Sequence, residues 1–219
     1  MSPIESFSKF ITSFSEQLTK PLPGVSAQYK MAPEDRIERE AMAHINNKQQ
    51  ISAVLILIFP DHEKPTVCFI RRQDYSGAHS GQISFPGGKN EEKDPDLWNT
   101  AIRETDEETG VKADQIKYIG KLTPLYIPVS NFWVHPFVGY LLHYPKFKMD
   151  KSEVKYILKV PLFEIMKQEI IEKSRQNIDS EKKEVPCYNY NGETIWGATA
   201  MILCEFLEIT SQILPDLYK

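Results

Sequence analysis

The pattern of hydrophobic and polar positions predicts strands that alternate with helices. Residues Ile51–Phe59 form a nearly continuous aliphatic run that ends at Pro60-Asp61, which is typical of a buried strand. The other expected strands are Thr66–Ile70, Ile116–Leu122, Val134–Leu142 and Tyr156–Val160. Helices are expected over residues 3–19, 33–48, 94–110, Leu162–Lys173 and Ala198–Leu214. Strands mixed with separated helices indicate a layered α/β or α+β domain.

The first part of the chain reads as a helical extension. Residues 3–19 place Ile4, Phe7, Phe10, Ile11, Phe14 and Leu18 at helical spacing, which predicts an amphipathic helix. The segment Pro21-Leu-Pro-Gly24 then interrupts the chain, and residues 33–48 are charged and helix-prone. We therefore expect an extension over residues 1–47 and a main domain over residues 48–219.

An acidic segment follows two glycines in the middle of the chain. Asp94 is expected to cap a helix whose first helical residue is Pro95, and Gly110 is expected to end it. One face of this helix is predicted to pack on the sheet. That face consists of Leu97, Trp98, Ala101, Ile102, Thr105 and Thr109.

Three carboxylates of this helix, Glu104, Glu107 and Glu108, are neighbours because they stand three and four positions apart. Asp106 points away from them and is expected to be solvated. Partly buried carboxylates at this density need positive charge among them, and Arg103 alone cannot neutralise three. A hard divalent cation can, which predicts a Mg²⁺ or Mn²⁺ site. The alternative is a solvated acidic helix face, which is common on protein surfaces.

Composition excludes several classes of protein. The net charge of −4 over 219 residues argues against a surface for nucleic acid, which needs clustered Lys and Arg. The scattered Cys68, Cys187 and Cys204 suit a reducing cytosol and do not suggest disulfides or structural zinc. The longest apolar run falls far short of the roughly twenty residues that a membrane helix needs. A cytoplasmic protein without membrane or nucleic-acid partners is therefore expected.

The acidic segment resembles the signature of the Nudix hydrolases, G-x5-E-x7-R-E-U-x-E-E-x-G-U, in which U is bulky and aliphatic. The matching residues here are Gly88, Asp94 and the run from Arg103 through Glu104, Glu107 and Glu108 to Gly110-Val111. Asp94 stands where the signature has Glu, Thr105 stands at the first U, and the spacer before Arg103 is one residue longer. The resemblance implies a Nudix-type α/β/α sandwich with a mixed sheet between helices, and a Nudix box at residues 88–111.

The resemblance also implies roles for residues at matching positions. The implied metal ligands are the carboxylates of Glu104, Glu107 and Glu108 and the carbonyl of Gly88, with Glu104 and Glu108 the main ones. Arg103 would orient Glu104 and form a salt bridge with Asp94. Glu153 precedes a predicted strand, where Nudix enzymes often place a further acid, so it is a candidate ligand or catalytic base. Alternatively, Glu153 is a solvated loop residue without a catalytic role.

The segment before the acidic helix is similar to the coenzyme A pyrophosphatase branch of that family, whose pattern ends R-x3-G-x3-F-P-G-G. This chain matches from Gly81 to Phe85-Pro-Gly-Gly88, but Gly77 stands at the Arg position. Further similar stretches are Leu22-Pro-Gly24 through Lys30–Pro33, Glu153-Val154 through Val160–Leu162, and Ile195–Ala200. The resemblance implies hydrolysis of coenzyme A or acyl-coenzyme A to 3′,5′-ADP and the (acyl-)4′-phosphopantetheine.

The candidates for substrate binding lie around this segment. Arg71, Arg72 or Lys89 could hold phosphates, and either arginine could supply the charge absent at Gly77. The remaining candidates are His79, Gln82 and Gly87. His79 has the alternative role of bracing the glycine-rich turn, and Trp196 is expected in the core rather than under an adenine.

Two other functions stay open. One is the same chemistry on another nucleoside diphosphate, such as ADP-ribose or a dinucleotide. The other is a catalytically silent Nudix fold that acts as a ligand sensor or assembly module. Retention of Glu104, Glu107 and Glu108 argues against the silent fold. The oligomeric state is open too, a homodimer included.

Overall fold

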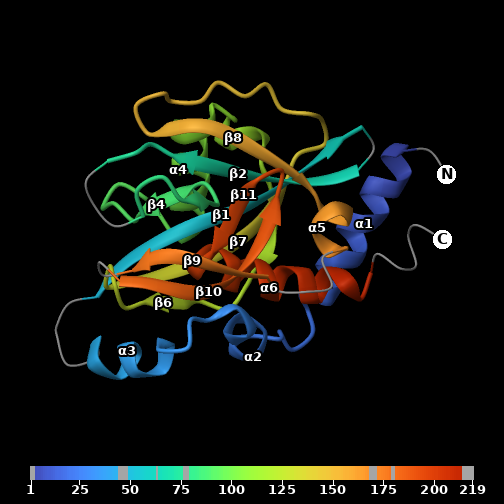
Figure 1. Ribbon diagram of the computed structural model, residues 1–219. Helices are drawn as coiled ribbons and strands as arrows, with labels where there is room; N and C mark the ends of the chain where they lie inside the picture. Colours follow the sequence, from blue (N-terminus) through green and yellow to red (C-terminus); the bar gives the residue numbers. More distant parts are fainter. Residues whose placement is uncertain are drawn as a thin grey trace.

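The computed structural model describes residues 3–43, 49–62, 64–75, 79–167, 172–178 and 181–213. A large sheet forms the centre of the molecule, and both ends of the chain lie on the same side of it (Figure 1). Helices cover both faces of this sheet, and a smaller sheet packs beside α6 at Gly197–Ser211. The predicted layered α/β sandwich with a mixed sheet is confirmed.

The main sheet has eight strands and follows the order β3-β2-β1-β7-β5, with β4 paired to β1, β6 to β7 and β8 to β2. The pairing of β1 with β7 is parallel, whereas the other pairings in this sheet are antiparallel. The eight strands are β1 Gln50–Asp61, β2 Lys64–Arg72, β3 Ile83–Ser84, β4 Gly87–Lys89, β5 Lys117–Lys121, β6 Leu125–Ile127, β7 Phe132–Tyr140 and β8 Val154–Pro161.

The second sheet is antiparallel and has the order β11-β10-β9. Its strands are β9 Glu172–Ile178, β10 Glu181–Tyr190 and β11 Glu193–Trp196. The helices other than α6 are α1 Pro3–Gln17, α2 Val25–Gln28, α3 Arg36–Ala43, α4 Leu97–Thr109 and α5 Leu162–Met166, with short 3₁₀ turns η1 Tyr29–Met31 and η2 Ala113–Gln115.

Side chains of β1 alternate between two cores, because successive residues of a strand point to opposite faces. Leu55, Leu57 and Phe59 join the core beneath α4, while Ile56 and Ile58 join the larger core beneath α1 and α6. Burial on both faces explains why this strand reads as a continuous aliphatic run rather than an alternating one.

All five strands expected from the sequence are confirmed, and the helices at both ends of the chain are present. The predicted helix Leu162–Lys173 is wrong beyond its first turn. It ends at Met166 as α5, and strand β9 has begun by Glu172. The predicted helix over residues 33–48 is shorter too, because α3 starts at Arg36; the end of that prediction, residues 44–48, lies outside the described part.

The N-terminal extension packs directly onto the main domain. The buried rings of Phe10 and Phe14 are 5.9 Å apart between centroids, and Phe14 is 5.0 Å from Phe206 of α6. The buried carboxylate of Glu205 in α6 accepts hydrogen bonds from the backbone N–H of Gly24, the side chain of Gln28 and the loop residue Thr123. These contacts fix the path of the chain that leads into α3.

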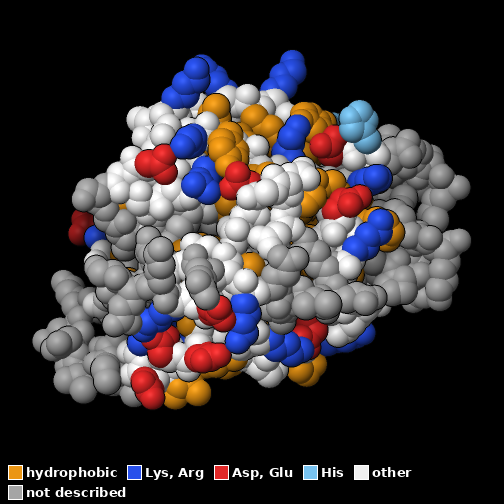
Figure 2. Space-filling model, viewed as in Figure 1, with side chains coloured by type: hydrophobic (Ala, Val, Ile, Leu, Met, Phe, Trp, Pro, Cys, Tyr) orange, Lys and Arg blue, Asp and Glu red, His pale blue; other side chains and the backbone are white. Residues whose placement is uncertain are grey.

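Lysine, arginine and acidic side chains are interspersed on the face of the molecule shown in Figure 2. None of the helices described is long and apolar enough to cross a membrane.

Candidate active site

The acidic helix α4 starts two residues later than its sequence indicates. The expectation that Asp94 is its N-cap is wrong: Asp96 holds that position, and its Oδ1 accepts a hydrogen bond of 2.8 Å from the backbone N–H of Asn99. Gly110 ends the helix in the left-handed region, at a φ of 75°, as glycine readily does. Asp94 is thereby free to pair with Arg103, which lies within the helix.

The predicted apolar face of α4 does pack on the sheet. Ala101, Thr105 and Thr109 are buried there. The hydroxyl of Thr105 donates to the carbonyl of Ala101 at 2.7 Å, and that of Thr109 donates to Thr105 at 2.6 Å. Since each hydroxyl is satisfied within the helix, Thr105 can stand at the position where the signature has an aliphatic residue.

Glu108 is the most buried carboxylate of the helix, with a side chain only 2% exposed. Its Oε2 accepts a 2.9 Å hydrogen bond from the backbone N–H of Gly87, and its Oε1 lies 3.6 Å from Nη1 of Arg72. Burial nevertheless dominates and raises the pKa of Glu108 to about 8, because these two partners offset only part of the lost hydration.

Strand β4 brings two glycines against the carboxylates. Gly87 has a φ of 148°, and a Cβ there would lie 2.3 Å from the carbonyl oxygen of Ala53 in β1. A Cβ on Gly88 would lie 2.4 Å from the carboxyl carbon of Glu104. Both positions therefore require glycine, and the backbone of β4 directly faces Glu104.

Arg103 gathers the other acids of the segment. Its Nη1 donates to Glu104 at 2.9 Å and to Glu107 at 3.0 Å, while its Nε and Nη2 hold Asp94. Burial raises the pKa of Glu104, and the contact with Arg103 counteracts this only in part. The side chain of Glu107 is 56% exposed, so this carboxylate lies at the edge of the group.

Glu153 is an exposed residue of the turn that precedes β8, and its charge acts on the same carboxylates. Its charge raises the pKa of both Glu104 and Glu108, which shows that the three carboxylates repel one another. The backbone N–H of Gln73 donates to its carbonyl at 2.8 Å, and this bond ties the Glu153 turn to the end of β2. Asp106 lies on the other side of α4, as expected, where Lys112 and the backbone N–H of Ala113 contact it; its side chain is partly exposed rather than fully solvated.

The residues present fit a divalent cation. Glu104 and Glu108 offer hard oxygen donors beside the glycine backbone of β4, and their mutual repulsion is relieved by positive charge. Among the described residues, no three carboxylate, imidazole or thiol side chains already converge at metal-binding distance. Arg103 contacts Oε1 of Glu104 and Oε2 of Glu107 and so holds both carboxylates in place.

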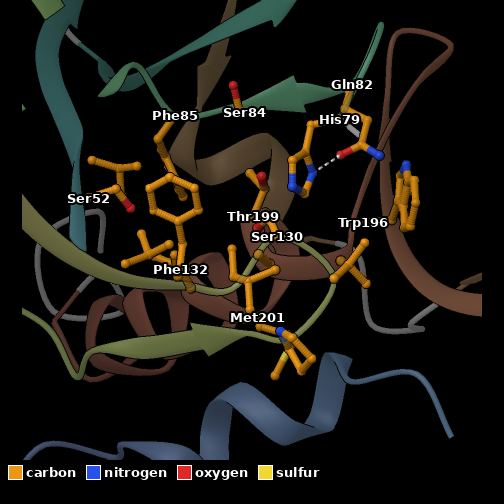
Figure 3. Close-up of a pocket in the computed structure, with 18 of the residues that line it drawn as sticks. Ser52, His79, Gln82, Ser84, Phe85, Ser130, Phe132, Trp196, Thr199 and Met201 are labelled. Atoms are coloured by element: carbon orange, nitrogen blue, oxygen red, sulfur yellow. Dashed lines mark hydrogen bonds between the residues drawn. The ribbon is translucent and has the colours of Figure 1, made fainter. Parts of the chain in front are cut away.

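A cavity of about 780 Å³ adjoins this acidic group, a volume in the range of small-molecule sites. It shares Arg72 and the strand Gly87–Lys89 with the acidic group, and then extends away from it. Phe85, Phe132, Thr199 and Met201 face its middle (Figure 3).

A polar side of the cavity is formed by the loop before β3. Nδ1 of His79 lies 3.1 Å from Oε1 of Gln82 (Figure 3), and Trp196 lines the same cavity. His79 has a φ of 67°, so its backbone takes a conformation that few side chains favour. Trp196, expected in the core, lines the cavity instead. Gly77, the position where the family pattern has Arg, lies outside the described residues.

The two candidate arginines of β2 point to different places. Arg72 lines the cavity, and its buried Nε has no hydrogen-bond partner. Arg71 does not line the cavity; its Nη1 forms a 3.1 Å ion pair with Glu193 of β11, to which the hydroxyl of Tyr156 also donates. Lys89 lines the cavity, and its carbonyl accepts from Arg103 at 3.3 Å.

Sequence reasoning missed the part that the extension plays in this cavity. Pro33, Asp35, Arg36 and Arg39 form one of its walls. The resemblance of Lys30–Pro33 to the coenzyme A pyrophosphatase branch could have drawn attention to the residues that follow it.

Comparisons with known proteins agree with the signature. The model of the NUDIX domain matches residues 49–170. A protein of Yersinia enterocolitica called "Uncharacterized Nudix hydrolase NudL" is 34% identical over 152 residues, which span 69% of this chain and 77% of that protein. Its Yersinia pestis counterpart is 35% identical over 155 residues, 69% of this chain and 75% of that protein.

Solved structures agree on the fold. The Nudix hydrolase RenU of M. smegmatis superposes with a TM-score of 0.52 at 14% identity, covering 75% of this chain and 88% of that one. A MutT/nudix family protein of Enterococcus faecalis gives 0.51 at 15% identity, covering 88% of this chain and 77% of that one.

Proposed function

The chain belongs to the Nudix hydrolase family and is a hydrolase of diphosphate bonds, and we propose that its substrate is coenzyme A or an acyl-coenzyme A. The products would be 3′,5′-ADP and 4′-phosphopantetheine or its acyl form. The more general activity follows from the family, whereas the substrate rests on this chain's own cavity.

One observation carries the proposal of substrate. The segments that resemble the coenzyme A pyrophosphatase branch are far apart in the sequence, yet each contributes to this site. The cavity is lined by Phe85, Gly87, Gly88 and Gly197–Thr199, and also by Pro33 of the extension and Trp196 of β11. Glu153, from the remaining segment, faces the carboxylates. Segments that are far apart in the sequence and line one cavity suit a shared ligand.

The residues of the acidic group have distinct proposed roles. Glu104, Glu108 and the carbonyl of Gly88 would hold Mg²⁺ or Mn²⁺, with Glu107 at the edge. A divalent cation there supplies neutralisation of the diphosphate oxygens and activation of water near neutral pH. Arg103 keeps Glu104 in place through its anchor on Asp94.

The chain's own groups then handle the substrate. Arg72 and Lys89 lie where the acidic group meets the cavity, and they would hold phosphate oxygens of the diphosphate. Glu153 is the proposed acceptor of the proton that the attacking water loses. Gln82 and His79, on the polar side, would donate hydrogen bonds to the nucleotide, while the backbone of Gly87 lets the diphosphate approach closely.

A direct comparison of substrates tests the proposal. Purified protein with Mg²⁺ is incubated separately with coenzyme A, acetyl-coenzyme A, ADP-ribose and a diadenosine polyphosphate, and products are identified by mass. We expect kcat/KM for coenzyme A to exceed that for ADP-ribose by at least about tenfold, or about 1.4 kcal/mol of transition-state binding.

The Glu108→Gln variant serves as the control in that comparison, because it removes a proposed ligand with little change in side-chain shape. A large fall in hydrolysis in this variant would assign the activity to this site rather than to a contaminant. If kcat/KM is higher for ADP-ribose or the dinucleotide than for coenzyme A, that compound is the better substrate and the proposal of coenzyme A is rejected. Absence of turnover on every diphosphate would favour a silent ligand-binding role.

A further inference from the structure

The end of the cavity away from the acidic helix contains a buried arginine of the N-terminal extension. The side chain of Arg36 is only 9% exposed and lines the cavity, and its Nε has no hydrogen-bond partner. Its Nη2 donates to the carbonyl of Tyr126 and lies 2.8 Å from Glu40. A buried guanidinium nitrogen without a partner beside a cavity is costly unless a ligand satisfies it.

The acidic residue that precedes Arg36 in the sequence, Asp35, is paired with other cations. Asp35 pairs with Arg39 at 2.8 Å and with Lys183 at 2.7 Å. Burial raises the pKa of Asp35, but these two cations outweigh burial and leave it below its usual value, so the carboxylate is charged. Asp35 is thus held by cations other than Arg36, and the ion pair of Arg36 itself is with Glu40. The buried Nε of Arg36 remains available to an anion in the cavity.

The register of the sheet gives the distance between the two ends of the cavity. Lys89 of β4 pairs with Ser52 of β1, which pairs with Val134 of β7, which pairs with Leu125 of β6. Adjacent strands are about 4.8 Å apart, so this row spans roughly 14 Å. The carbonyl that holds Arg36 belongs to the residue after Leu125. The guanidinium is therefore too far to share the oxygens that Lys89 and Arg72 can reach.

We propose that Arg36 forms a second anion subsite, which takes the phosphate monoester on the ribose of the nucleotide substrate. This inference rests on the proposed function, because coenzyme A has two kinds of phosphate. The diphosphate belongs beside the acidic helix, which leaves the 3′-phosphate for the Arg36 end. The N-terminal extension would thus determine specificity for a nucleotide that carries this phosphate.

The test compares coenzyme A with dephospho-coenzyme A, which lacks only the 3′-phosphate. We expect the wild-type protein to favour coenzyme A in kcat/KM by about tenfold or more, as for a charge-assisted hydrogen bond. Arg36→Ala should reduce this ratio nearly to one, and Arg36→Lys should retain part of it. Lys173→Ala is the matched control: it removes the same charge from the same region, but at a side chain 56% exposed and outside the cavity.

A binding measurement separates this inference from the proposed function. Calorimetric titration compares adenosine 3′,5′-bisphosphate with adenosine 5′-monophosphate, and neither ligand has a diphosphate to hydrolyse. Arg36→Ala should weaken only the bisphosphate, again by about tenfold or more. Glu40→Gln should strengthen binding of the bisphosphate, because the carboxylate of Glu40, which competes with the phosphate for Arg36, is replaced by a neutral amide. Thermal unfolding shows whether each variant is folded. If Arg36→Ala does not fold, the bisphosphate affinities of Arg36→Lys and Glu40→Gln test the subsite instead.

The outcomes differ for the two claims. Arg36-dependent preference for the bisphosphate without turnover of coenzyme A would support the subsite and reject the proposed substrate. The subsite would be rejected, and the proposed substrate kept, if the protein hydrolyses coenzyme A but the Arg36 and Glu40 variants behave like the wild type. In that case neither the preference for coenzyme A over dephospho-coenzyme A nor the affinity for the bisphosphate would change.

Discussion

The guanidinium of Arg103 meets the carboxylate of Asp94 at two points: Nε donates to Oδ1 at 2.8 Å, and Nη2 donates to Oδ2 at 2.9 Å. Asp94 also accepts from the hydroxyl of Thr100 at 2.9 Å and from the backbone N–H of Glu91 at 3.1 Å. The remaining nitrogen of Arg103 contacts Glu104. Asp94 therefore fixes the arginine that orients a proposed metal ligand.

We expect Asp94→Asn to weaken Mn²⁺ binding and kcat/KM by about ten- to a hundredfold, the usual cost of losing a residue that orients a metal ligand. Asn can accept from Arg103 but lacks the charge and the second carboxylate oxygen. Asp94→Glu, which restores the residue of the family signature, should recover much of the loss. Titration of Mn²⁺ and steady-state kinetics measure both effects.

Asp96→Asn is the control for that prediction, since Asn caps a helix as well as Asp does. It changes the same charge two residues away and should leave both quantities near the wild-type values. Equal Mn²⁺ affinity in Asp94→Asn and the wild type would show that Arg103 needs no anchor.

Sequence alone could locate the acidic helix but not its first residue. Asp94 and Asp96 both flank Pro95, and either can cap a helix by local rules. The choice depends on Arg103, which draws Asp94 away, and such a long-range partner leaves no trace in local propensity. For a similar reason β9 was missed: its sequence, Glu172–Ile178, is largely polar, and its pairing with β10 decides its structure.

The candidate site could be predicted from the sequence where it depends on local spacing, and not where it depends on long-range packing. The spacing of Glu104 and Glu108 on one helix places them together, whatever surrounds the helix. Arg71 and Arg72 are equivalent in the sequence, but the register of β2 against β8 shifts between them, and of the two only Arg72 lines the cavity. The contribution of Arg36 depends on how the extension folds back over β6, which no local pattern predicts.

Glu104→Gln and Glu108→Gln are each expected to lower kcat by at least about a hundredfold, as for the loss of one electrostatic group from a catalytic site. Circular dichroism should show an unchanged fold. Asp106→Asn is the matched control on the same helix, because its contacts with Lys112 and Ala113 lie on the other side. Wild-type turnover in both glutamine variants would remove these residues from the proposed metal site.

The stability of the metal-free protein should fall as the pH rises from about 5 to about 8. Burial raises the pKa of Glu108 from 4.5 to about 8, so over this range the folded state binds a proton that the unfolded state has lost. This contribution is complete below the unfolded pKa and disappears as the pH passes the folded one, with a slope of up to about 1.4 kcal/mol per pH unit.

Urea unfolding in a chelator at several pH values measures this slope. Glu108→Gln should flatten it and should raise the free energy of unfolding of the metal-free protein near pH 8. Adding Mg²⁺ should stabilise the wild type most at high pH, where the carboxylate that binds the cation is ionised. An identical pH dependence in Glu108→Gln would assign the titration to another group.

The two arginines at the end of β2 should respond differently to substitution. Arg72 lines the cavity with a buried Nε that lacks a partner, so Arg72→Ala should lower kcat/KM by about 1.5–3 kcal/mol, the value of a charge-assisted hydrogen bond. Arg72→Lys should recover only part, because the two-point contact with a phosphate is lost. Arg71→Ala should instead cost about 1 kcal/mol or less of stability, as its ion pair with Glu193 is partly exposed.

Glu193→Gln gives the matched comparison, because it breaks the same ion pair from the side of β11. If Arg71 acts only through Glu193, the double variant should be no less stable than either single one, and kcat/KM should change little in all three. A larger loss of kcat/KM in Arg71→Ala than in Arg72→Ala, without the same loss in Glu193→Gln, would make Arg71 the phosphate-binding residue. Arg72 would then act mainly on Glu108, whose Oε1 it approaches to 3.6 Å.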